Sequence, residues 1–195
     1  MIHWRAVGAK IAFIGTHGVG KTVLTFSLAG TLRAMGVDAD VAYENSRRSP
    51  FPINEGTTLE SQLWIQTAQV QAELEASRRA ALVICDRAVI DNYAYLVRAC
   101  GEQEHLHPFL RHWCTTYAAL FWVPIIDATI APDAVRATSP PFQREIHERI
   151  GSLVARFELG DRLVTLPAER DRHIPIVLET LRARRVLPPE QRRLF

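Results

Sequence analysis

One eight-residue segment near the N-terminus constrains the fold of this chain more than any other feature. Residues 15–22 read GTHGVGKT and fit the phosphate-loop pattern G-x-x-x-x-G-K-[ST]. The apolar residues 11–14 come before it, and apolar residues at helical spacing follow it. These flanks predict a buried strand, a Walker A loop and a helix whose N-terminus faces the bound phosphates.

The residue types in this loop indicate how it would bind a nucleoside triphosphate. Glycines let the backbone turn tightly and present N–H groups to phosphate oxygens. Lys21 is expected to reach the β- and γ-phosphates, and the Thr22 hydroxyl to bind Mg²⁺, which prefers oxygen ligands. His17 fills a variable position and is interpreted as a solvated loop residue. The predicted nucleotide ligands are Gly15, Gly18, Val19, Gly20, Lys21, Thr22 and Val23, with ATP as the nucleotide and GTP as the alternative.

Composition favours a single domain over residues 1–195, because 48% of the chain is hydrophobic and no linker interrupts it. The 23 basic and 21 acidic side chains leave a charge of +2, too small to indicate a polyanionic partner. Arginines gather in residues 182–195, which predicts a basic tail. Nucleic-acid binding by this tail is the alternative to simple solvation.

Apolar runs and cysteine spacing predict where the protein is located. No apolar run approaches the roughly 20 residues that a membrane span needs. The three cysteines have no metal-ligand spacing, which is typical of buried thiols in a reducing compartment. We therefore expect a cytoplasmic protein without a membrane partner. The sequence leaves open whether the chain forms a homo-oligomer.

Polar residues follow the predicted second strand, residues 38–43. In open α/β sheets, ligands bind outside the carboxyl ends of the strands. Glu44 is therefore predicted to face an acceptor near the γ-phosphate and to act as its general base. A solvated carboxylate beside Arg47 and Arg48 is the alternative.

The apolar run of residues 80–86 ends in Asp86, with Arg87 next. A buried strand that ends in a carboxylate beside the phosphate-loop strand places Asp86 near Mg²⁺, directly or through a metal-bound water. Asp86 is thus a predicted metal ligand and a second candidate base, and a helix cap is the alternative. Arg87 is expected at the mouth of the site.

The rest of the chain supplies further elements. Thr57 and Glu60 fit a capping box for a helix ending near Arg79, and residues 120–123 and 162–166 fit core strands. Residues 131–141 have the composition of a lid. Arg136 on this lid would move onto the phosphates and stabilise the transition state, with a solvated flap arginine as the alternative.

Three segments resemble the P-loop nucleoside/nucleotide kinase-like group: residues 15–22, 83–96 and 133–146. Within that group the chain is similar to AAA-labelled domains that resemble the kinase half of bacterial nicotinamide-riboside kinases. Asp86-Arg87 looks like the D/E-R signature of thymidylate and deoxynucleoside kinases. The resemblance implies an α/β P-loop NTPase fold of three layers, α/β/α, with a lid and a parallel five-stranded sheet in the order 2-3-1-4-5. The chain departs from arginine-rich lids because Arg136 stands alone at the centre.

These observations lead to one main hypothesis and two alternatives. The main hypothesis is Mg²⁺-dependent transfer of the γ-phosphoryl group of ATP to a hydroxyl of a small nucleoside-like acceptor. The first alternative is a polynucleotide or modified-base DNA kinase that uses Arg47, Arg48 and the tail. The second is a regulatory ATPase or GTPase switch with a protein partner. The predicted catalytic residues are Lys21, Glu44, Asp86, Arg87 and Arg136.

Overall fold

Five parallel strands form the centre of the computed structural model, which describes residues 8–53, 56–126 and 140–189. Their order in the sheet is β2-β3-β1-β4-β5, and every neighbouring pair is parallel. The predicted P-loop NTPase topology is therefore confirmed. The strands are β1 (Ala9–Ile14), β2 (Ala39–Ala42), β3 (Leu82–Asp86), β4 (Tyr117–Trp122) and β5 (Leu163–Thr165).

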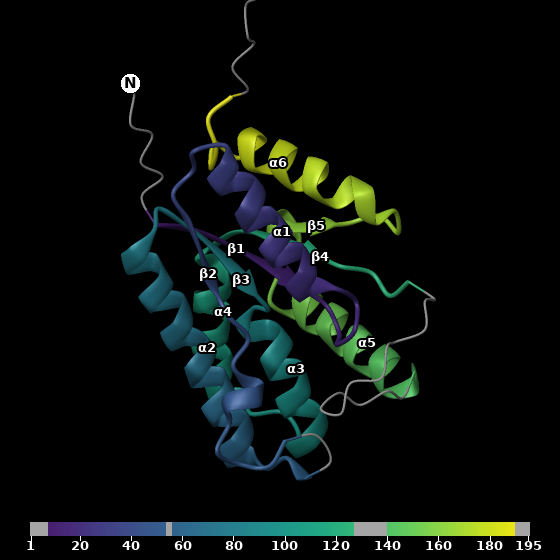
Figure 1. The fold of residues 1–195 in the computed structure, drawn as a ribbon. Coiled ribbons are helices and arrows are strands. Elements are labelled where there is room, and N and C mark those ends of the chain that lie inside the picture. The colour runs from purple at the N-terminus through teal and green to yellow at the C-terminus, as the bar shows by residue number, and fades with distance from the viewer. Residues whose placement is uncertain (1–7, 54–55, 127–139, 190–195) are drawn as a thin grey trace, which may run out of the picture.

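Helices cover both faces of the sheet and complete the three layers (Figure 1). α1 and α6 lie on one face, and α2, α3 and α5 lie on the other. The helices are α1 (Lys21–Ala34), α2 (Leu59–Arg79), α3 (Val89–Cys100), α4 (His107–Thr115), α5 (Pro140–Arg156) and α6 (His173–Ala183). Among these described helices, none combines the length and the apolar character needed to cross a bilayer.

The alternation of side chains along β1 explains why both layers are needed. Ile11 and Phe13 belong to the core beneath α1 and α6, whereas Ala12 and Ile14 belong to the core beneath α3 and α5. All four are fully buried. A strand covered on both faces has a continuous apolar sequence, which is why the run of residues 11–14 was informative.

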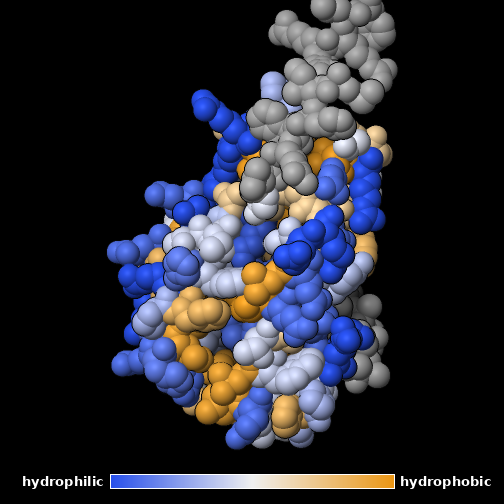
Figure 2. All heavy atoms as spheres, turned by 90° about the vertical axis from the view of Figure 1, so that its left-hand side faces the viewer, coloured by the Kyte–Doolittle hydropathy of each residue, from blue (hydrophilic) through white to orange (hydrophobic). Residues whose placement is uncertain are grey.

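Helix α2 differs from the other helices because much of its buried face is polar. Its buried residues are Ser61, Gln62, Ile65, Gln66, Gln69, Glu73 and Ala76. Figure 2 views the molecule from the side of α2, and hydrophilic and hydrophobic residues are interspersed on this outer face. The polar groups on the inner face need partners within the protein, and Gln66 and Gln69 find theirs in the segment after β3.

One local prediction was wrong, and one helix was not predicted. The N-cap of α2 is Thr58, whose hydroxyl accepts a hydrogen bond from the backbone N–H of Ser61, so the capping box is shifted by one residue from Thr57 and Glu60. The box is completed by a serine hydroxyl where the usual pattern has Glu or Gln. Helix α4 was not predicted, and it carries Pro108 in its first turn, where proline is favoured.

The predicted lid and the predicted tail lie partly outside the described residues. The lid, residues 131–141, includes Arg136 and falls largely there, while Pro140 at its end begins α5. The first part of the predicted tail is described and packs on the domain. Val186 and Leu187 are buried in the core beneath α1 and α6, and the Arg184 guanidinium donates to the carbonyl of Ala118.

Candidate active site

The loop between β1 and α1 has the backbone that a phosphate site requires. Gly15, Gly18 and Gly20 have φ angles of 139°, 76° and 97°, in the region that favours glycine. Gly20 is the N-cap of α1, so the first N–H groups of the helix open into the loop. At Gly15 space is also limiting, because an added Cβ would lie 2.8 Å from the carbonyl oxygen of Val123.

Lys21 lies inside this loop and not at its surface. Its amine donates hydrogen bonds to the carbonyls of Gly15 at 2.7 Å and Thr16 at 2.5 Å. Burial, and then the positive charge of Arg87, lower the pKa of Lys21 to about 8. A bound phosphate would place negative charge beside the buried amine and stabilise its protonated form. The geometry therefore favours an anion at this position.

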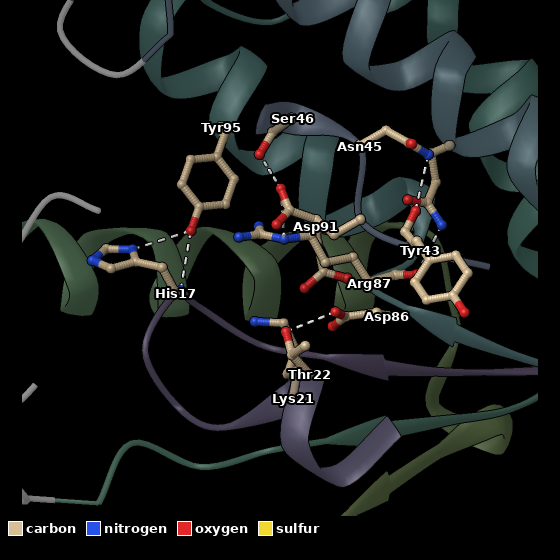
Figure 3. A network of polar contacts seen from close by, with 12 residues as sticks. His17, Lys21, Thr22, Tyr43, Asn45, Ser46, Asp86, Arg87, Asp91 and Tyr95 are labelled. Carbon is tan, nitrogen blue, oxygen red and sulfur yellow. Dashed lines mark hydrogen bonds and ion pairs between the residues drawn. The ribbon is translucent and has the colours of Figure 1, made fainter. Parts of the chain in front are cut away.

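Thr22 and Asp86 meet at the carboxyl end of the sheet (Figure 3). The Thr22 hydroxyl donates to Oδ2 of Asp86 at 2.7 Å. The helix-cap alternative for Asp86 is wrong, because the N-cap of α3 is Ala88 and its N–H donates to Asp91. A hydroxyl and a carboxylate beside a phosphate loop fit Mg²⁺, which keeps several waters and takes its other ligands from phosphates.

Glu44 follows β2 and faces Arg87. Its Oε1 lies 3.8 Å from Nε of Arg87, and it accepts a hydrogen bond from the Ser46 hydroxyl. Only 17% of the Glu44 side chain is exposed, so the solvated alternative does not describe it. Burial raises the pKa of Glu44, but the charge of Arg87 and the hydrogen bond from Ser46 outweigh burial, so the pKa lies below its ordinary value. The side chain is therefore a carboxylate at neutral pH.

Arg87 is fixed on several sides. Its guanidinium carbon lies 5.0 Å from the centre of the Tyr95 ring, a cation–π distance. Burial lowers the pKa of Arg87, but interactions with Tyr95, Glu44 and Asp91 outweigh burial, so the pKa lies above its ordinary value. Its backbone φ is +91°, which is uncommon for a residue with a side chain. Such conformations persist where the surroundings impose them, often at functional sites.

The interpretation of His17 as a solvated residue is wrong. His17 is buried, and the Tyr95 hydroxyl accepts a hydrogen bond from its backbone N–H at 3.1 Å. The same hydroxyl contacts Nδ1 at 3.1 Å (Figure 3), and Gln143 from α5 donates to the His17 carbonyl. The motif could not indicate this burial, because the covering groups come from α3 and α5.

Asp91 joins two backbone segments. Its Oδ1 accepts the N–H of Gly15 at 2.7 Å, and its Oδ2 accepts the N–H of Ala88 at 2.9 Å. Burial raises the pKa of Asp91, against the charges of Lys21 and Arg87. Asp91 lies in the first turn of α3, where an acidic residue is favoured, but its contact with Gly15 depends on how α3 packs beside the phosphate loop.

Two hollows adjoin at this end of the sheet. The first lies at the phosphate loop, with Lys21, Thr22 and Asp86 in its wall. The second lies between α2 and α3, and its wall includes Gln62, Asn92, Tyr95 and Phe142. His17, Glu44 and Arg87 line both hollows. The pair formed by Glu44 and Arg87 therefore lies at the junction of the two hollows.

An arginine from the connection between β5 and α6 also approaches the loop. A Cβ placed on Gly20 would lie 3.8 Å from a terminal nitrogen of Arg170. Sequence analysis assigned no role to Arg170, because nothing in its local pattern separates it from its neighbours Arg172 and Glu169. Its position beside the phosphate loop follows from the sheet order alone.

Comparisons with known proteins bear on the family and the fold of the chain. A family model described as AAA domain matches residues 10–170. Solved structures of NadR protein, one in complex with NR and one with NAD and AMP-PNP, are similar with TM-scores of 0.75 and 0.73 at 20% and 19% identity. The chain is covered to 96% in both and spans about half of those proteins, 54% and 52%.

A thymidylate kinase from Ehrlichia chaffeensis is similar with a TM-score of 0.62 at 18% identity, over 90% of this chain and 97% of that one. No curated protein sequence matches the chain. At these identities the solved structures show a shared fold, and the fold they share is that of P-loop kinases.

Proposed function

Because the chain belongs to the AAA domain family and has the fold of P-loop kinase-like NTPases, we propose that it is an ATP-dependent kinase of a small nucleoside-like acceptor. The observation that carries this proposal is the position of Glu44 and Arg87, which line both the phosphate hollow and the hollow beside it. A hydrolase needs only water at the γ-phosphate, whereas an adjoining hollow with a carboxylate at its junction suits a second substrate.

The transfer step divides between these residues. The Glu44 carboxylate takes the proton of the acceptor hydroxyl as the hydroxyl oxygen forms a bond to the γ-phosphorus. The bond between that phosphorus and the bridging oxygen breaks, and ADP leaves with the electron pair. Lys21 and Arg87 neutralise the charge on the transferring group. Mg²⁺, held by Thr22 and Asp86 together with the phosphates, would supply further charge neutralisation.

The lining of the second hollow supports a nucleoside-like acceptor. Amides of Gln62 and Asn92 offer donors and acceptors for a polar ring edge or a sugar, while Tyr95 and Phe142 offer aromatic surface. NadR protein was solved in complex with NR, and its structure shares the fold of this chain. A nucleoside whose hydroxyl points toward Glu44 is therefore the acceptor class that we propose, with ATP as donor and GTP as the alternative.

A direct test measures ADP formation from ATP and Mg²⁺ with a panel of nucleosides, nucleoside monophosphates and oligonucleotides, each against a reaction without acceptor. We expect one nucleoside to raise ADP formation well above the basal rate and to appear as its phosphate ester by mass spectrometry. Stimulation only by oligonucleotides would favour the polynucleotide kinase. Hydrolysis that no acceptor stimulates would favour the regulatory switch and contradict the proposal.

A further inference from the structure

Two glutamines on the buried face of α2 contact the backbone around Arg87. Nε2 of Gln69 donates to the carbonyl of Arg87 at 3.1 Å, and Nε2 of Gln66 donates to the carbonyl of Val89 at 3.1 Å. Gln69 is 1% exposed and Gln66 is 4% exposed. Neither contributes to the walls of the two hollows described above. They are thus close to the site without being part of its surface.

The orientation of the Gln69 amide follows from its partners. Its nitrogen also lies 3.0 Å from Oε1 of Glu73, so it faces a carboxylate and a carbonyl, both of which only accept hydrogen bonds. An oxygen in that place would be repelled by both, which fixes the nitrogen there. Within the described residues, the Oε1 atoms of Gln66 and Gln69 are buried and accept no hydrogen bond. Each side chain therefore gives a hydrogen bond to a backbone carbonyl, while its own amide oxygen accepts none.

Glu73 gives Gln69 a rigid support. The Glu73 carboxylate is 1% exposed and pairs with the amine of Lys10 at 2.6 Å. It also accepts hydrogen bonds from Trp113 at 2.7 Å and from the hydroxyl of Tyr117 at 2.6 Å. A buried carboxylate with this many partners has little freedom to move.

The same network contacts the Arg87 segment a third time. The Tyr117 hydroxyl, which donates to Glu73, accepts the backbone N–H of Val89 at 3.2 Å. Side chains from α2 and β4 thus bind Arg87 O, Val89 N and Val89 O. This is the segment in which Arg87 has its positive φ of 91°. A strained conformation of this kind persists only when several contacts define it together.

We propose that Gln69 is a positioning residue that holds Arg87 in the conformation needed for phosphoryl transfer, with Gln66 as its neighbour in the same role. Gln69 acts through the Arg87 carbonyl and touches no substrate. Without this donor, the segment can relax toward an ordinary φ, and the guanidinium moves away from Glu44 and Tyr95. The kinetic part of this inference rests on the proposed kinase function.

The first test replaces Gln69 with leucine, which has a similar size and removes the donor together with the unsatisfied oxygen. We expect acceptor phosphorylation to fall about tenfold to a hundredfold, the effect of a modest displacement of a catalytic group. ATP affinity should stay near that of the unmodified protein, and the melting temperature should fall by only a few degrees, because the buried carbonyl of Arg87 loses one donor. The matched control is Gln71→Leu on the exposed side of α2, where the amide contacts only Glu75 among the contacts described, and we expect no loss.

A double-mutant cycle separates positioning from a general structural effect. In an Arg87→Met background, Gln69→Leu should lower the residual rate by less than about twofold, because its effect requires the guanidinium. If the two losses multiply, Gln69 acts independently of Arg87 and the inference is overturned. Should Gln69→Leu fail to fold, Gln69→Met preserves the length of the side chain and takes its place in the cycle.

A measurement without catalysis keeps the inference testable if the proposed function fails. The Nε–H group of Arg87 can be assigned by NMR as the signal that disappears in Arg87→Lys. That signal should shift or broaden in Gln69→Leu and remain in place in Gln71→Leu. An unchanged signal in Gln69→Leu would overturn the positioning role even if the protein is a kinase. A shifted signal in a protein that phosphorylates no acceptor would uphold positioning while the function fails.

Discussion

The hydroxyl of Thr22 and Oδ2 of Asp86 lie 2.7 Å apart, although 64 residues separate them in the chain. They meet because β1 and β3 are neighbours in register, with Phe13 beside Asp86, so the residues after β1 and at the end of β3 share one edge of the sheet. This contact joins the phosphate loop to the carboxylate that would help to hold the metal.

The first prediction concerns the metal. Asp86→Asn keeps the shape of the side chain and removes its charge, so it should raise the Mg²⁺ concentration needed for half-maximal activity by about tenfold or more, while metal-free ATP binding changes little. A titration of Mg²⁺ against activity is the measurement. Asp161→Asn changes an exposed carboxylate outside the site and serves as the control. An unchanged Mg²⁺ requirement in Asp86→Asn would rule out the metal role.

The second prediction concerns the base. If Glu44 takes the proton of the acceptor, Glu44→Gln should cut acceptor phosphorylation by roughly two to four orders of magnitude, the usual contribution of a positioned base. ATP affinity should remain close to that of the unmodified protein. Single-turnover transfer and nucleotide affinity are measured on the same preparation. Retained transfer would move the base assignment to Asp86.

The third prediction uses the pKa of Glu44. The Ser46 hydroxyl helps to lower that pKa, so Ser46→Ala should raise it. Glu44 must be ionised to act as a base, and the acidic limb of the kcat/KM profile should therefore move to higher pH in Ser46→Ala. Activity at alkaline pH should change much less. Parallel pH profiles of the two proteins provide the test, and coincident acidic limbs would disagree with it.

The fourth prediction follows from the pKa of Lys21, which is about 8 without nucleotide. Phosphate charge raises that pKa on binding, so above pH 8 the protein must take up a proton to bind ATP. ATP affinity should therefore fall as pH rises, approaching about tenfold per pH unit above pH 8. Lys21→Ala should bind ATP weakly with a flatter pH dependence and should not transfer phosphate. Calorimetric titrations at several pH values measure both proteins.

The fifth prediction compares Gly15 and Gly30, two glycines whose surroundings differ. Gly15→Ala combines a φ of 139° with a Cβ 2.8 Å from the Val123 carbonyl oxygen, and it should lower the free energy of unfolding by about 2 kcal/mol or more. Gly30 lies within α1 with no atom within 4 Å of an added Cβ. Gly30→Ala should stabilise the protein by about 0.5–1 kcal/mol. Denaturant unfolding compares the two, and similar effects would contradict the assigned geometry.

Local sequence determined much of the fold. The phosphate loop, the strand before it and the helix after it were predictable because glycine, an apolar run and helical spacing each act over a few neighbouring residues. The resemblance to P-loop kinases supplied the strand order, and the structure confirmed it. Glu44 and Asp86 were predicted from a general rule, that ligands bind at the carboxyl ends of parallel strands.

Only the tertiary structure decided which groups these residues contact. The burial of His17, the pairing of Glu44 with Arg87, and the support of Arg87 by Gln69 all join elements that are far apart in the chain. No local pattern encodes them. A hydrogen bond requires the donor and the acceptor to be placed to within a few tenths of an ångström, and packing brings these groups together from distant parts of the chain. The sequence by itself thus determined the phosphate loop, and the packing of α2, α3 and α5 decided the shape of the site around it.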